Sequence, residues 1–499
     1  MGGNETRMTE RVLVAGAGIA GLGAALALGG GAREVVILDR DPPPPELSPD
    51  EAFYKWERKG ATQLRHSHAF LGRLTALIRD RYPDLLQELL AEGTRLFGFA
   101  DALPPALERK YEKAPGDEDM YLLFSRRTTL ELTIRRHAAR IPGVTFVTNA
   151  AVRGLIARRD AGRLVVEGLR VERDGTTEDM RADVVVDATG RNTVFPEWLR
   201  AEGAAIREES SPCGILYFTR HYRLRDGQDE PARDGTPGGG DLGYIKFGVF
   251  IADNRHFSVT LATPEIETGM RMAVVKPENF DSICLALPGA ARWMNPQRAE
   301  PVSQVFSMGN LQNVWRNFVK DGAPEALGFF ALGDAAVRTN PLYGRGCSSG
   351  VVEAHLLREA LDTAADPARR ALLYDRAVRK VIRPYFDSMA KLDLQAIRRA
   401  EHERDPRYVP GWRARLAKSF AEDGLMPAQR GDVEVARALS RIFHMLDEPQ
   451  TLLRRPALIA RILCVWAMPR AAKTARNYYP PKFGPERAEM FARLGLAAS

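Results

Sequence analysis

Cysteine is scarce in this sequence. The 499 residues contain four cysteines, Cys213, Cys284, Cys347 and Cys464, which are far apart and form no C-x-x-C pair. This spacing indicates neither a disulfide framework nor a zinc knuckle. The start of the sequence also has no apolar stretch that could act as a secretion signal. We therefore expect a protein of a reducing, cytoplasmic compartment.

Long hydrophobic runs are lacking too. The most apolar stretch, Leu452–Met468, is interrupted by Arg454, Arg455, Pro456 and Arg461. A membrane-spanning helix needs about twenty predominantly apolar residues, so we predict no transmembrane helix. Two interpretations stay open: a helix packed on the protein core, or a surface that makes peripheral contact with a membrane or a lipid-like substrate.

The net positive charge is confined to the C-terminal part of the chain. The formal net charge is +7, and the residues from Ala396 onward contain 19 Lys and Arg against 11 Asp and Glu. The rest of the chain is therefore close to neutral. This distribution is typical of a solvated helix surface, or of contact with an anionic surface. Because no RNA-binding module is recognisable, we expect no nucleic-acid partner.

A glycine-rich turn near the start of the chain carries the strongest signal. An apolar strand over Val12–Ala15 is followed by G-x-G-x-x-G at Gly16, Gly18 and Gly21, and then by a helix of small residues. Glycine at these positions permits a tight turn, close approach of a pyrophosphate to the backbone, and close packing of helix on strand. Asp39 ends the next strand, where a carboxylate can bind a ribose. The pattern predicts a dinucleotide site.

Two later segments also read as a strand followed by a turn. The apolar strand in ADVVVDATGRNT (182–193) ends at Asp187, and the strand Gly328–Leu332 is followed by GDAAVRTNPLYGRGCSSG. A helix over Gly346–Leu361 follows the second turn. Ligands of doubly wound sheets lie at the carboxyl ends of the strands. We therefore expect both turns to border the nucleotide, with the helix N-terminus facing negative charge.

The order of these segments predicts an α/β fold (α+β overall), with a Rossmann-like domain, an inserted antiparallel β-sheet and a C-terminal helical region. The β-rich runs Ile215–Leu224, Tyr244–Ile251 and His256–Ala262 follow one another without predicted helices, which favours an antiparallel sheet. We expect a nucleotide-binding domain at 8–193 and 322–365, a substrate-binding domain at 194–321, and helices at 366–499. Helical spacing also predicts a helix over Leu71–Leu90 and another over Ser125–Ala139.

Two groups of side chains allow more than one interpretation. His66 and His68 would point to the same side of an extended segment, but no third ligand lies near them, so we predict no metal site. Aromatic residues of the inserted sheet fit either the wall of an apolar pocket or ordinary core. These aromatic residues are Tyr217, Phe218, Tyr244, Phe247 and Phe250.

The motifs GAGIAG with Asp39, DATGRN and GDAAVRTNPLYGRGCSSG occur in this order. This ordered set resembles the single-component FAD-dependent monooxygenases of the aromatic hydroxylase and squalene epoxidase type. GATQLRHSHAFL resembles the G-x-P-Q-x-R-H-x-H segment of bacterial flavin epoxidases acting on polyene chains, although Thr62 stands where proline is usual. The closing stretch, LLRRPALIARIL followed by PPKFGPERAEMF, resembles the tail of the same group.

The resemblance implies noncovalent FAD as cofactor, with NAD(P)H or reduced flavin as the electron source. It assigns to FAD binding Gly16, Gly18, Ala20, Gly21, Asp39, Arg40, Arg127, Val152, Gly333, Asp334, Pro341, Gly344, Gly346 and Cys347, with Arg126 as the alternative to Arg127. It assigns to the catalytic region, beside the flavin ring or the substrate, Gln63, Arg65, His66, Pro341 and Gly346.

The reaction that the resemblance implies is insertion of one oxygen atom from O2 into an apolar small molecule through a flavin C4a-hydroperoxide. Alkene epoxidation or hydroxylation in polyketide or terpenoid metabolism would be the outcome, and a flavin reductase is a candidate partner. A prenyl-chain reductase of the geranylgeranyl type and an RNA-modifying flavoprotein are the alternatives, because a fold does not fix a reaction. The W-x-W-x-I-P signature of flavin halogenases is absent from the sequence.

Overall fold

The computed structural model describes residues 9–61 and 63–496. Thr62, and residue 8 at the start of the expected nucleotide-binding domain, lie outside the described residues. Residue contacts divide the chain into two compact units. Unit 1 comprises residues 1–64, 128–211 and 312–387, and unit 2 comprises residues 65–127, 212–311 and 388–499.

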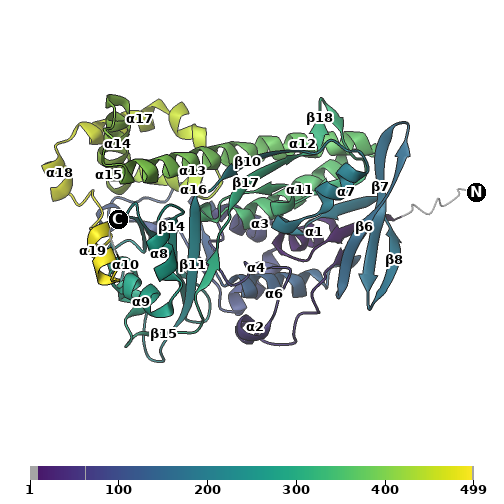
Figure 1. Ribbon diagram of the computed structural model, residues 1–499, viewed down its shortest axis with the longest axis horizontal. Coiled ribbons are helices and arrows are strands. Elements are labelled where there is room, and N and C mark those ends of the chain that lie inside the picture. The colour runs from purple at the N-terminus through teal and green to yellow at the C-terminus, as the bar shows by residue number, and fades with distance from the viewer. Residues whose placement is uncertain (1–8, 62, 497–499) are drawn as a thin grey trace, which may run out of the picture. The chain divides into compact units, whose positions relative to one another are not determined.

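Figure 1 shows the ribbon of the chain. Unit 1 is built on a parallel sheet with the strand order β20-β9-β1-β2-β5. Its strands are β1 (Glu10–Ala15), β2 (Arg33–Leu38), β5 (Val144–Val147), β9 (Val184–Asp187) and β20 (Phe329–Ala331). In the central strand β1, Val14 pairs with Ile37 on one side and with Val186 on the other. The side chains of Val12–Ala15 are buried, as expected for a parallel sheet with protein on both faces.

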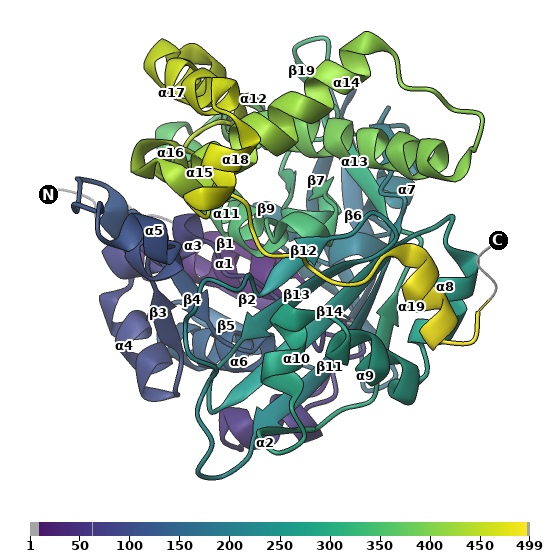
Figure 2. The same cartoon turned by 90° about the vertical axis from the view of Figure 1, so that its left-hand side faces the viewer.

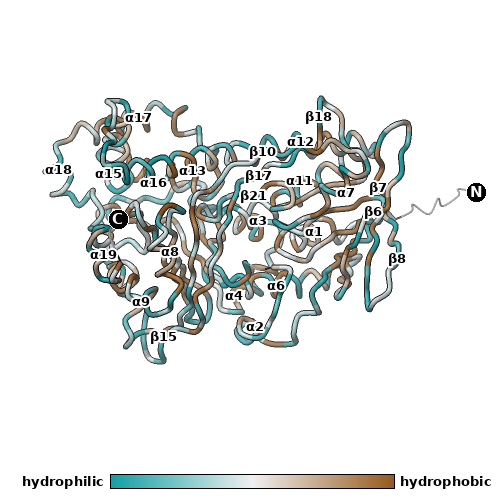
Figure 3. The backbone as a smooth tube through the Cα atoms, in the orientation of Figure 1, coloured by the Kyte–Doolittle hydropathy of each residue, from teal (hydrophilic) through white to brown (hydrophobic). Residues whose placement is uncertain are grey.

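Helices and small antiparallel sheets complete unit 1. The helices are α1 (Ile19–Leu28), α2 (Pro49–Lys55), α6 (Arg127–Ala138), α7 (Phe195–Ala201), α11 (Gly346–Thr363), α12 (Pro367–Val381) and the first turns of α13 (Arg383–Arg404). The further strands are β6 (Ala150–Asp160), β7 (Arg163–Arg173), β8 (Thr176–Arg181), β10 (Arg207–Pro212), β17 (Gln312–Asn317), β18 (Val319–Lys320), β19 (Ala323–Pro324) and β21 (Val337–Arg338). Strand β8 is mostly exposed, and its polar residues appear teal in Figure 3.

Unit 2 contains the antiparallel sheet β12-β13-β14-β11-β15, and β16 also pairs with β11. These strands are β11 (Ile215–Leu224), β12 (Gly239–Asp241), β13 (Lys246–Ile251), β14 (His256–Pro264), β15 (Ala299–Pro301) and β16 (Phe306–Met308). A two-stranded sheet is formed by β3 (Arg95–Phe97) and β4 (Leu122–Phe124). The helices are α3 (Gly72–Arg81), α4 (Pro83–Ala91), α5 (Pro105–Glu108), α8 (Thr268–Val274), α9 (Pro277–Leu285), α10 (Pro288–Met294), α14 (Trp412–Ser419), α15 (Met426–Gly431), α16 (Val433–Phe443), α17 (Pro456–Ala467), α18 (Arg470–Ala475) and α19 (Arg487–Arg493).

The two faces of the unit 2 sheet differ in chemistry. Along β14, Phe257, Val259 and Leu261 join an apolar core with α8, α9 and α10, which lie beside the sheet in Figure 2. Ser258 and Thr260 alternate with them and therefore lie on the other face, because successive strand residues point to opposite sides. The sheet thus has one apolar face and one face that carries hydroxyl groups.

The aromatic residues of the inserted sheet are mostly core. Phe218, Tyr244 and Phe247 belong to the apolar cluster that includes α8, α9 and α10. Tyr217 is buried in a separate small cluster with Ile215. The structure therefore favours the core interpretation for these four side chains.

The predicted fold class is confirmed: a parallel sheet with flanking helices, an antiparallel sheet formed by inserted strands, and a mostly helical C-terminal part are all present. One local prediction is wrong. The predicted helix Leu71–Leu90 is two helices, because Tyr82 leaves helical geometry at φ −138° and Pro83 starts the second. The three predicted strands of the inserted sheet follow one another without a helix, as expected, and α8, α9 and α10, which were not predicted, lie between β14 and β15.

The compact units group the residues differently from the three expected domain ranges. Residues 65–127, expected in the nucleotide-binding domain, belong to unit 2, and Arg126 of this segment pairs with Asp253 of the loop between β13 and β14. Residues 388–499, expected as a separate helical region, belong to the same unit. A segment early in the chain thus packs on a sheet formed much later, which no local sequence pattern reveals.

The apolar stretch Leu452–Met468 forms the 3-10 helix η7 (Pro449–Arg454) and α17. Leu458, Ile462 and Val465 of α17 are buried in an apolar cluster of unit 2. This part of the stretch is therefore core, as the first of the two interpretations predicts. Within the described residues, no helix is both long enough and apolar enough to cross a membrane.

Candidate functional site

The three glycines of the turn between β1 and α1 have different surroundings. Gly16 has φ +102°, and a Cβ there would lie 2.6 Å from the carbonyl oxygen of Ala188. A Cβ at Gly21 would lie 1.8 Å from the carbonyl oxygen of Gly16, which is fixed backbone. At Gly18, by contrast, no described atom would lie within 4 Å of a Cβ. Gly16 and Gly21 close the turn, and Gly18 leaves space for a ligand to reach the backbone.

Helix α1 begins directly behind this open space. Gly18 is its N-cap, no side chain of the described residues caps it, and its first turn contains no acidic residue. The first N–H groups of a helix lack partners within the helix and carry partial positive charge. A phosphate group fits this position, so the turn is suited to the pyrophosphate of a dinucleotide.

A buried cluster of charged side chains lies beside the glycine turn. The Asp39 carboxylate accepts hydrogen bonds from Arg135 at 2.8 Å and from Arg58 at 3.2 Å. The Arg58 guanidinium also donates to Asp41 at 3.2 Å and to Glu131 at 3.1 Å. These five side chains, Asp39, Asp41, Arg58, Glu131 and Arg135, are buried in unit 1.

Arg58 connects this charged cluster to the glycine turn, since it also donates to the carbonyl oxygen of Ala17 at 3.2 Å. Burial lowers the pKa of Arg58, but the Glu131, Asp39 and Asp41 carboxylates outweigh that effect and leave the pKa above its ordinary value. Sequence reasoning missed Arg58, Glu131 and Arg135 as members of this site. The only available signal was the spacing of Glu131 and Arg135, which lie one turn apart on α6.

The turn after β9 packs against the glycine turn. The buried Asp187 carboxylate accepts hydrogen bonds from the hydroxyl groups of Thr189 at 2.6 Å and Thr193 at 2.5 Å, and from the Thr189 N–H at 2.9 Å. Burial raises the pKa of Asp187 above its usual range, and these hydrogen bonds oppose the shift. Asp187 therefore holds the turn in place, and the neighbouring Ala188 contacts Gly16.

A second turn follows β20 in the same unit. Gly333 and Asp334 form the 3-10 helix η4 (Gly333–Ala335), and Arg316 donates to the carbonyl oxygens of Asp334 and Ala335. A Cβ built on Gly346 at the start of α11 would have, among the described residues, only the Asp334 carboxylate within 4 Å. No described side chain caps α11, and its first turn contains no acidic residue. The turn thus offers a carboxylate beside a second uncapped helix N-terminus.

The other residues of this turn are held by polar contacts. Asn340 accepts a hydrogen bond from the Leu342 N–H at 3.0 Å and donates its own N–H to Asn313 at 2.9 Å. Pro341 is exposed at the start of η5 (Pro341–Tyr343), and Gly344 ends it at φ +65°. These contacts fix the chain that leads into α11.

Glu353 on α11 is a buried acid behind the Gly333 turn. One carboxyl oxygen accepts a hydrogen bond from the Gly333 N–H at 2.6 Å, and the other has no partner among the described residues. Burial raises the pKa of Glu353 to about 8. Sequence reasoning missed this residue, because nothing in a helical pattern distinguishes a buried glutamate from an exposed one.

The remaining residues assigned to FAD binding lie in unit 1, with the exception of Arg127. Ala20 packs under Gly333 and Gly350, so its role in the structure is close helix packing. Arg40 is exposed and donates to the carbonyl oxygen of Lys59 at 2.7 Å. Val152 lies half-buried on β6, and Cys347 is buried in the first turn of α11.

Unit 2 holds the second set of predicted residues. The Arg65 carbonyl oxygen accepts a hydrogen bond from His221 Nε2 at 2.8 Å, and His66 Nδ1 lies 3.2 Å from the Thr219 hydroxyl oxygen. His68 Nδ1 donates to the His66 carbonyl oxygen at 2.8 Å, and its Nε2 then accepts from Arg127 at 3.0 Å. Segment 65–68 therefore lies on the hydroxyl-bearing face of the sheet, whereas Gln63 belongs to unit 1.

The three histidines of this region are neutral near pH 7. Burial lowers the pKa of His66 to about 4 and that of His221 to about 3. Burial and the neighbouring Arg127 guanidinium hold the pKa of His68 well below its usual range. Among the residues that the structure describes, no three His, Cys, Asp or Glu side chains are grouped as metal ligands.

Arg126 and Arg127 have different surroundings. Arg126 forms a buried ion pair with Asp253, which accepts from the Arg126 Nε at 2.6 Å and from its backbone N–H at 2.7 Å. Arg127 contacts His68 instead. Between the two arginines that the sequence offers for FAD binding, the structure commits Arg126 to a structural pair.

Comparison with known proteins finds no family model that matches the chain. It is 26% identical to Protein Rv3254 of Mycobacterium tuberculosis over 472 residues, which cover 88% of this chain and 90% of that protein.

Several solved structures are similar. The flavin-dependent brominase Bmp2 has a TM-score of 0.59 at 16% identity, over 91% of this chain and 98% of its own. The anhydrotetracycline hydroxylase OxyS of Streptomyces rimosus has a TM-score of 0.55 at 18% identity, over 88% and 76%. PqsL of Pseudomonas aeruginosa, a probable FAD-dependent monooxygenase, has a TM-score of 0.53 at 17% identity, over 78% and 97%. The chain shares its fold with these three proteins.

Proposed function

We propose that this protein is an FAD-dependent monooxygenase that inserts one oxygen atom from O2 into an apolar small molecule. The observation that carries the proposal is the open backbone approach at Gly18, in front of a helix with no acid in its first turn. The ordered turn motifs and the shared fold support it. When bound, FAD would supply the redox and oxygen-activating chemistry that protein side chains lack.

The residues of unit 1 would bind FAD noncovalently. The N-terminus of α1 at Gly18 would hold the pyrophosphate. Asp39 would accept a ribose hydroxyl, because a carboxylate has about four acceptor positions and the described contacts use three. Asp334 would bind the ribityl chain, and the N-terminus of α11 at Gly346 would stabilise negative charge on the flavin ring.

Residues of the catalytic region would orient the substrate and exclude water rather than act as nucleophiles. We assign this role to Gln63, Arg65, His66, Pro341 and Gly346. Arg127 would contact the cofactor, in preference to Arg126. Within this function we propose alkene epoxidation in polyketide or terpenoid metabolism, with hydroxylation as the second outcome of the same oxygen transfer.

Cofactor content tests the first part of the proposal. The purified protein should be yellow and should release FAD on denaturation. Asp334→Ala should weaken FAD binding by about 1.5–3 kcal/mol, the contribution of a hydrogen bond to a charged group. The exposed carboxylate of Glu178 on β8 provides the control, because Glu178→Ala should leave FAD binding unchanged. A colourless protein that FAD does not reconstitute would refute the proposal.

Oxygen labelling tests the reaction. With labelled O2, one labelled atom should appear in the product. Turnover without oxygen would instead support a prenyl-chain reductase, and RNA binding that weakens steeply with salt would support an RNA-modifying flavoprotein. Oxidation of NAD(P)H by the purified protein alone would identify NAD(P)H as the direct electron source. A requirement for added reductase would identify reduced flavin and a partner protein.

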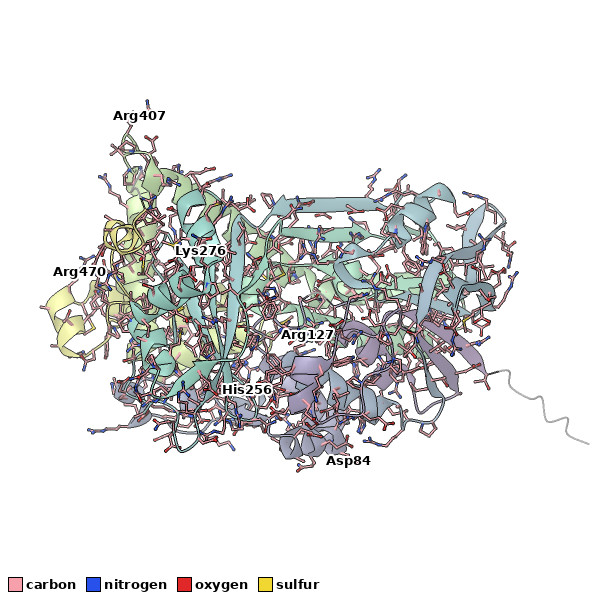
Figure 4. All side chains as sticks on the ribbon, turned by 60° about the horizontal axis from the view of Figure 1, so that its bottom comes forward. Asp84, Arg127, His256, Lys276, Arg407 and Arg470 are labelled. Carbon is pink, nitrogen blue, oxygen red and sulfur yellow. The ribbon has the colours of Figure 1, made fainter. Side chains whose placement is uncertain are left out.

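We also propose a peripheral contact of unit 2 with an anionic membrane surface, through residues 405–418. Every residue of this segment is exposed, and it contains three arginines and Lys418 against the single acid Asp405. Val409 is 80% exposed and Trp412 is 64% exposed. Tryptophan with flanking basic residues is typical of a membrane interface. In Figure 4, Arg407 of this segment projects from unit 2.

The arginines of the stretch Leu452–Met468 are all paired with acidic residues. Arg454 lies 3.7 Å from Glu448, Arg455 lies 3.2 Å from Asp447, and Arg461 lies 2.8 Å from Asp432. Within the described chain, Arg415 makes no ion pair. These differences make the two sets of arginines a matched comparison.

Vesicle binding tests the membrane contact. Replacing Arg413 and Arg415 by Gln should weaken binding to phosphatidylserine-containing vesicles by about 1 kcal/mol for each charge. Replacing Arg454 and Arg455 by Gln should change it less. Equal binding by both double variants and the unchanged protein would refute the contact at this segment.

A further inference from the structure

A chain of hydrogen bonds connects four hydroxyl groups to His66 on the polar face of the unit 2 sheet. His66 Nδ1 lies 3.2 Å from the Thr219 Oγ1, which lies 2.8 Å from the Thr260 Oγ1. The Thr260 hydroxyl donates to the Ser67 Oγ at 2.7 Å, and the Ser67 Oγ lies 2.7 Å from the Ser258 Oγ. Thr219, Thr260 and Ser258 are buried. The chain thus runs between strands β11 and β14 and segment 65–68.

The direction of this chain follows from counting protons. Each hydroxyl group has one proton to donate. At the bond between Thr260 and Ser67, the geometry makes Thr260 the donor. Thr260 has then spent its proton, so Thr219 must donate to Thr260. Thr219 has in turn spent its own, so only a proton on His66 Nδ1 can make the bond between Thr219 and His66.

The consequence is a defined tautomer of His66. With burial lowering its pKa to about 4, the ring carries a single proton at neutral pH. That proton sits on Nδ1, and Nε2 therefore carries a lone pair. Nε2 has no hydrogen-bond partner among the described residues, and the side chain is only half-buried. The ring centroids of His66 and Phe306 lie 6.3 Å apart in an edge-to-face arrangement, so the imidazole packs against an aromatic ring.

We propose that the hydroxyl chain orients His66 so that Nε2 accepts a hydrogen bond from an O–H or N–H group of the ligand. Thr219, Thr260 and Ser67 are then positioning residues, which act through His66. The substrate class becomes an apolar molecule with a hydrogen-bond donor, and this part rests on the proposed monooxygenase function. The tautomer itself does not depend on that function.

The neighbouring imidazoles do not compete for this role. His68 has both ring nitrogens engaged, one with the His66 carbonyl oxygen and one with Arg127. His221 donates its Nε2 proton to the Arg65 carbonyl oxygen. Both hold the backbone of segment 65–68. The Nδ1 lone pair of His221 is buried, so among these three imidazoles the lone pair that a ligand can approach is that of the half-buried His66.

Nitrogen NMR of the full-length protein, labelled in its histidine rings, tests the tautomer. The chain has eight histidines, and His66→Gln assigns the relevant signals by their loss. We expect His66 with a protonated Nδ1 and an unprotonated Nε2. A protonated Nε2 would overturn the proposal, because the hydroxyl chain would then run in the opposite direction.

Two variants test whether the chain sets the tautomer. Thr219→Val removes the acceptor for the Nδ1 proton without changing the size of the side chain. Thr260→Val removes the acceptor of Thr219, whose hydroxyl can then turn and donate to Nδ1. Both changes should move the proton to Nε2, so the test survives if one variant fails to fold. An unchanged tautomer in a folded variant would overturn the proposal.

The ligand class is tested with two probes that differ in a single group. Decanol carries an O–H donor, and its methyl ether does not. Decanol should shift the His66 Nε2 signal of the FAD-loaded protein, and the ether should leave it unchanged. Equal shifts would overturn the assignment of a donor-bearing ligand. Because these readouts need no turnover, their outcome is separable from that of the oxygen-labelling experiment.

Discussion

The glycine turn of unit 1 and the hydroxyl chain of unit 2 differ in the kind of group that surrounds them. Beside the turn, two guanidinium groups and three carboxylates are buried together. In the chain, four neutral hydroxyl groups lead to a neutral imidazole. Removing one side chain from a buried cluster of charged residues leaves an uncompensated charge, which lowers the unfolding free energy by several kcal/mol. Removing a neutral hydroxyl costs far less.

The difference also concerns what each region can specify. Charged side chains fix the position of the backbone, because their pairing tolerates little change. A row of hydroxyl groups contributes little energy, yet it has a direction, since each group donates once. We infer that unit 1 provides a rigid binding surface, whereas unit 2 provides an oriented acceptor.

The largest effect is expected within the glycine turn itself. Gly21→Ala would bring a methyl group within 1.8 Å of the Gly16 carbonyl oxygen, which cannot move without opening the turn. We expect a loss of more than about 4 kcal/mol in unfolding free energy, which is larger than most single substitutions cause. Urea unfolding followed by circular dichroism measures it.

Gly18→Ala is the matched control, because a methyl group there meets no described atom within 4 Å. This variant should fold with a change below about 1 kcal/mol. Its FAD binding should nevertheless weaken, since the methyl group occupies the space in front of α1. Equal destabilisation by both variants would contradict the division of roles within the turn.

The next largest effect should come from Arg58. Arg58→Ala removes the guanidinium that pairs with Asp39, Asp41 and Glu131. Breaking a buried pair in this way costs about 3–5 kcal/mol. Arg58→Lys should recover part of the loss, because it restores charge but not the three-way geometry of the guanidinium. A loss below about 1 kcal/mol in Arg58→Ala would show that the charged cluster is not what stabilises the turn.

These two regions also show which parts of the structure can be predicted from the sequence. The glycine turn could be predicted because its constraints act between residues close in the chain, as between Gly16 and Gly21. Strand β11 could be predicted for the same reason, and its observed range Ile215–Leu224 is the predicted one. The assigned roles of the site residues, from Gly18 to Cys347, stay predictions.

The rest depends on contacts between distant residues. Arg58 and Glu131 are 73 residues apart, and Ser67 and Thr260 are 193 apart. Nothing near Arg58 in the sequence distinguishes it from an exposed arginine, and Thr219 and Thr260 fit the polar side of any strand. Helices α8, α9 and α10 were missed because their short apolar runs lack the length that a helical period needs.

The pH dependence of stability should show whether the buried Glu353 carboxyl behind the Gly333 turn is protonated in the folded protein. Burial raises its pKa to about 8 in the folded protein, against 4.5 for the exposed group. Between these values the folded state holds a proton that the unfolded state has lost, so stability falls as pH rises. Glu353→Gln removes this dependence, and its amide oxygen can still accept from the Gly333 N–H.

Relative to the unchanged protein, the Gln variant should gain stability from pH 5 to pH 8, by about 1.4 kcal/mol per pH unit at most. Urea unfolding at several pH values measures the difference. The exposed Glu178 gives the control, since Glu178→Gln should show no such trend. A constant difference between wild type and Glu353→Gln would mean that Glu353 is ionised in the folded protein.

The smallest effect is expected at the far end of the hydroxyl chain. Ser258 shares one hydrogen bond with Ser67, in which either hydroxyl can be the donor. Ser258→Ala therefore removes one neutral hydrogen bond, which is worth about 0.5–1.5 kcal/mol in unfolding free energy. The direction of the remaining chain is set at the bond between Thr260 and Ser67, so the His66 tautomer should stay the same in nitrogen NMR. A loss as large as that of Arg58→Ala would remove the energetic distinction between the two regions. A changed tautomer would show that the direction is set at Ser258 and not at Thr260.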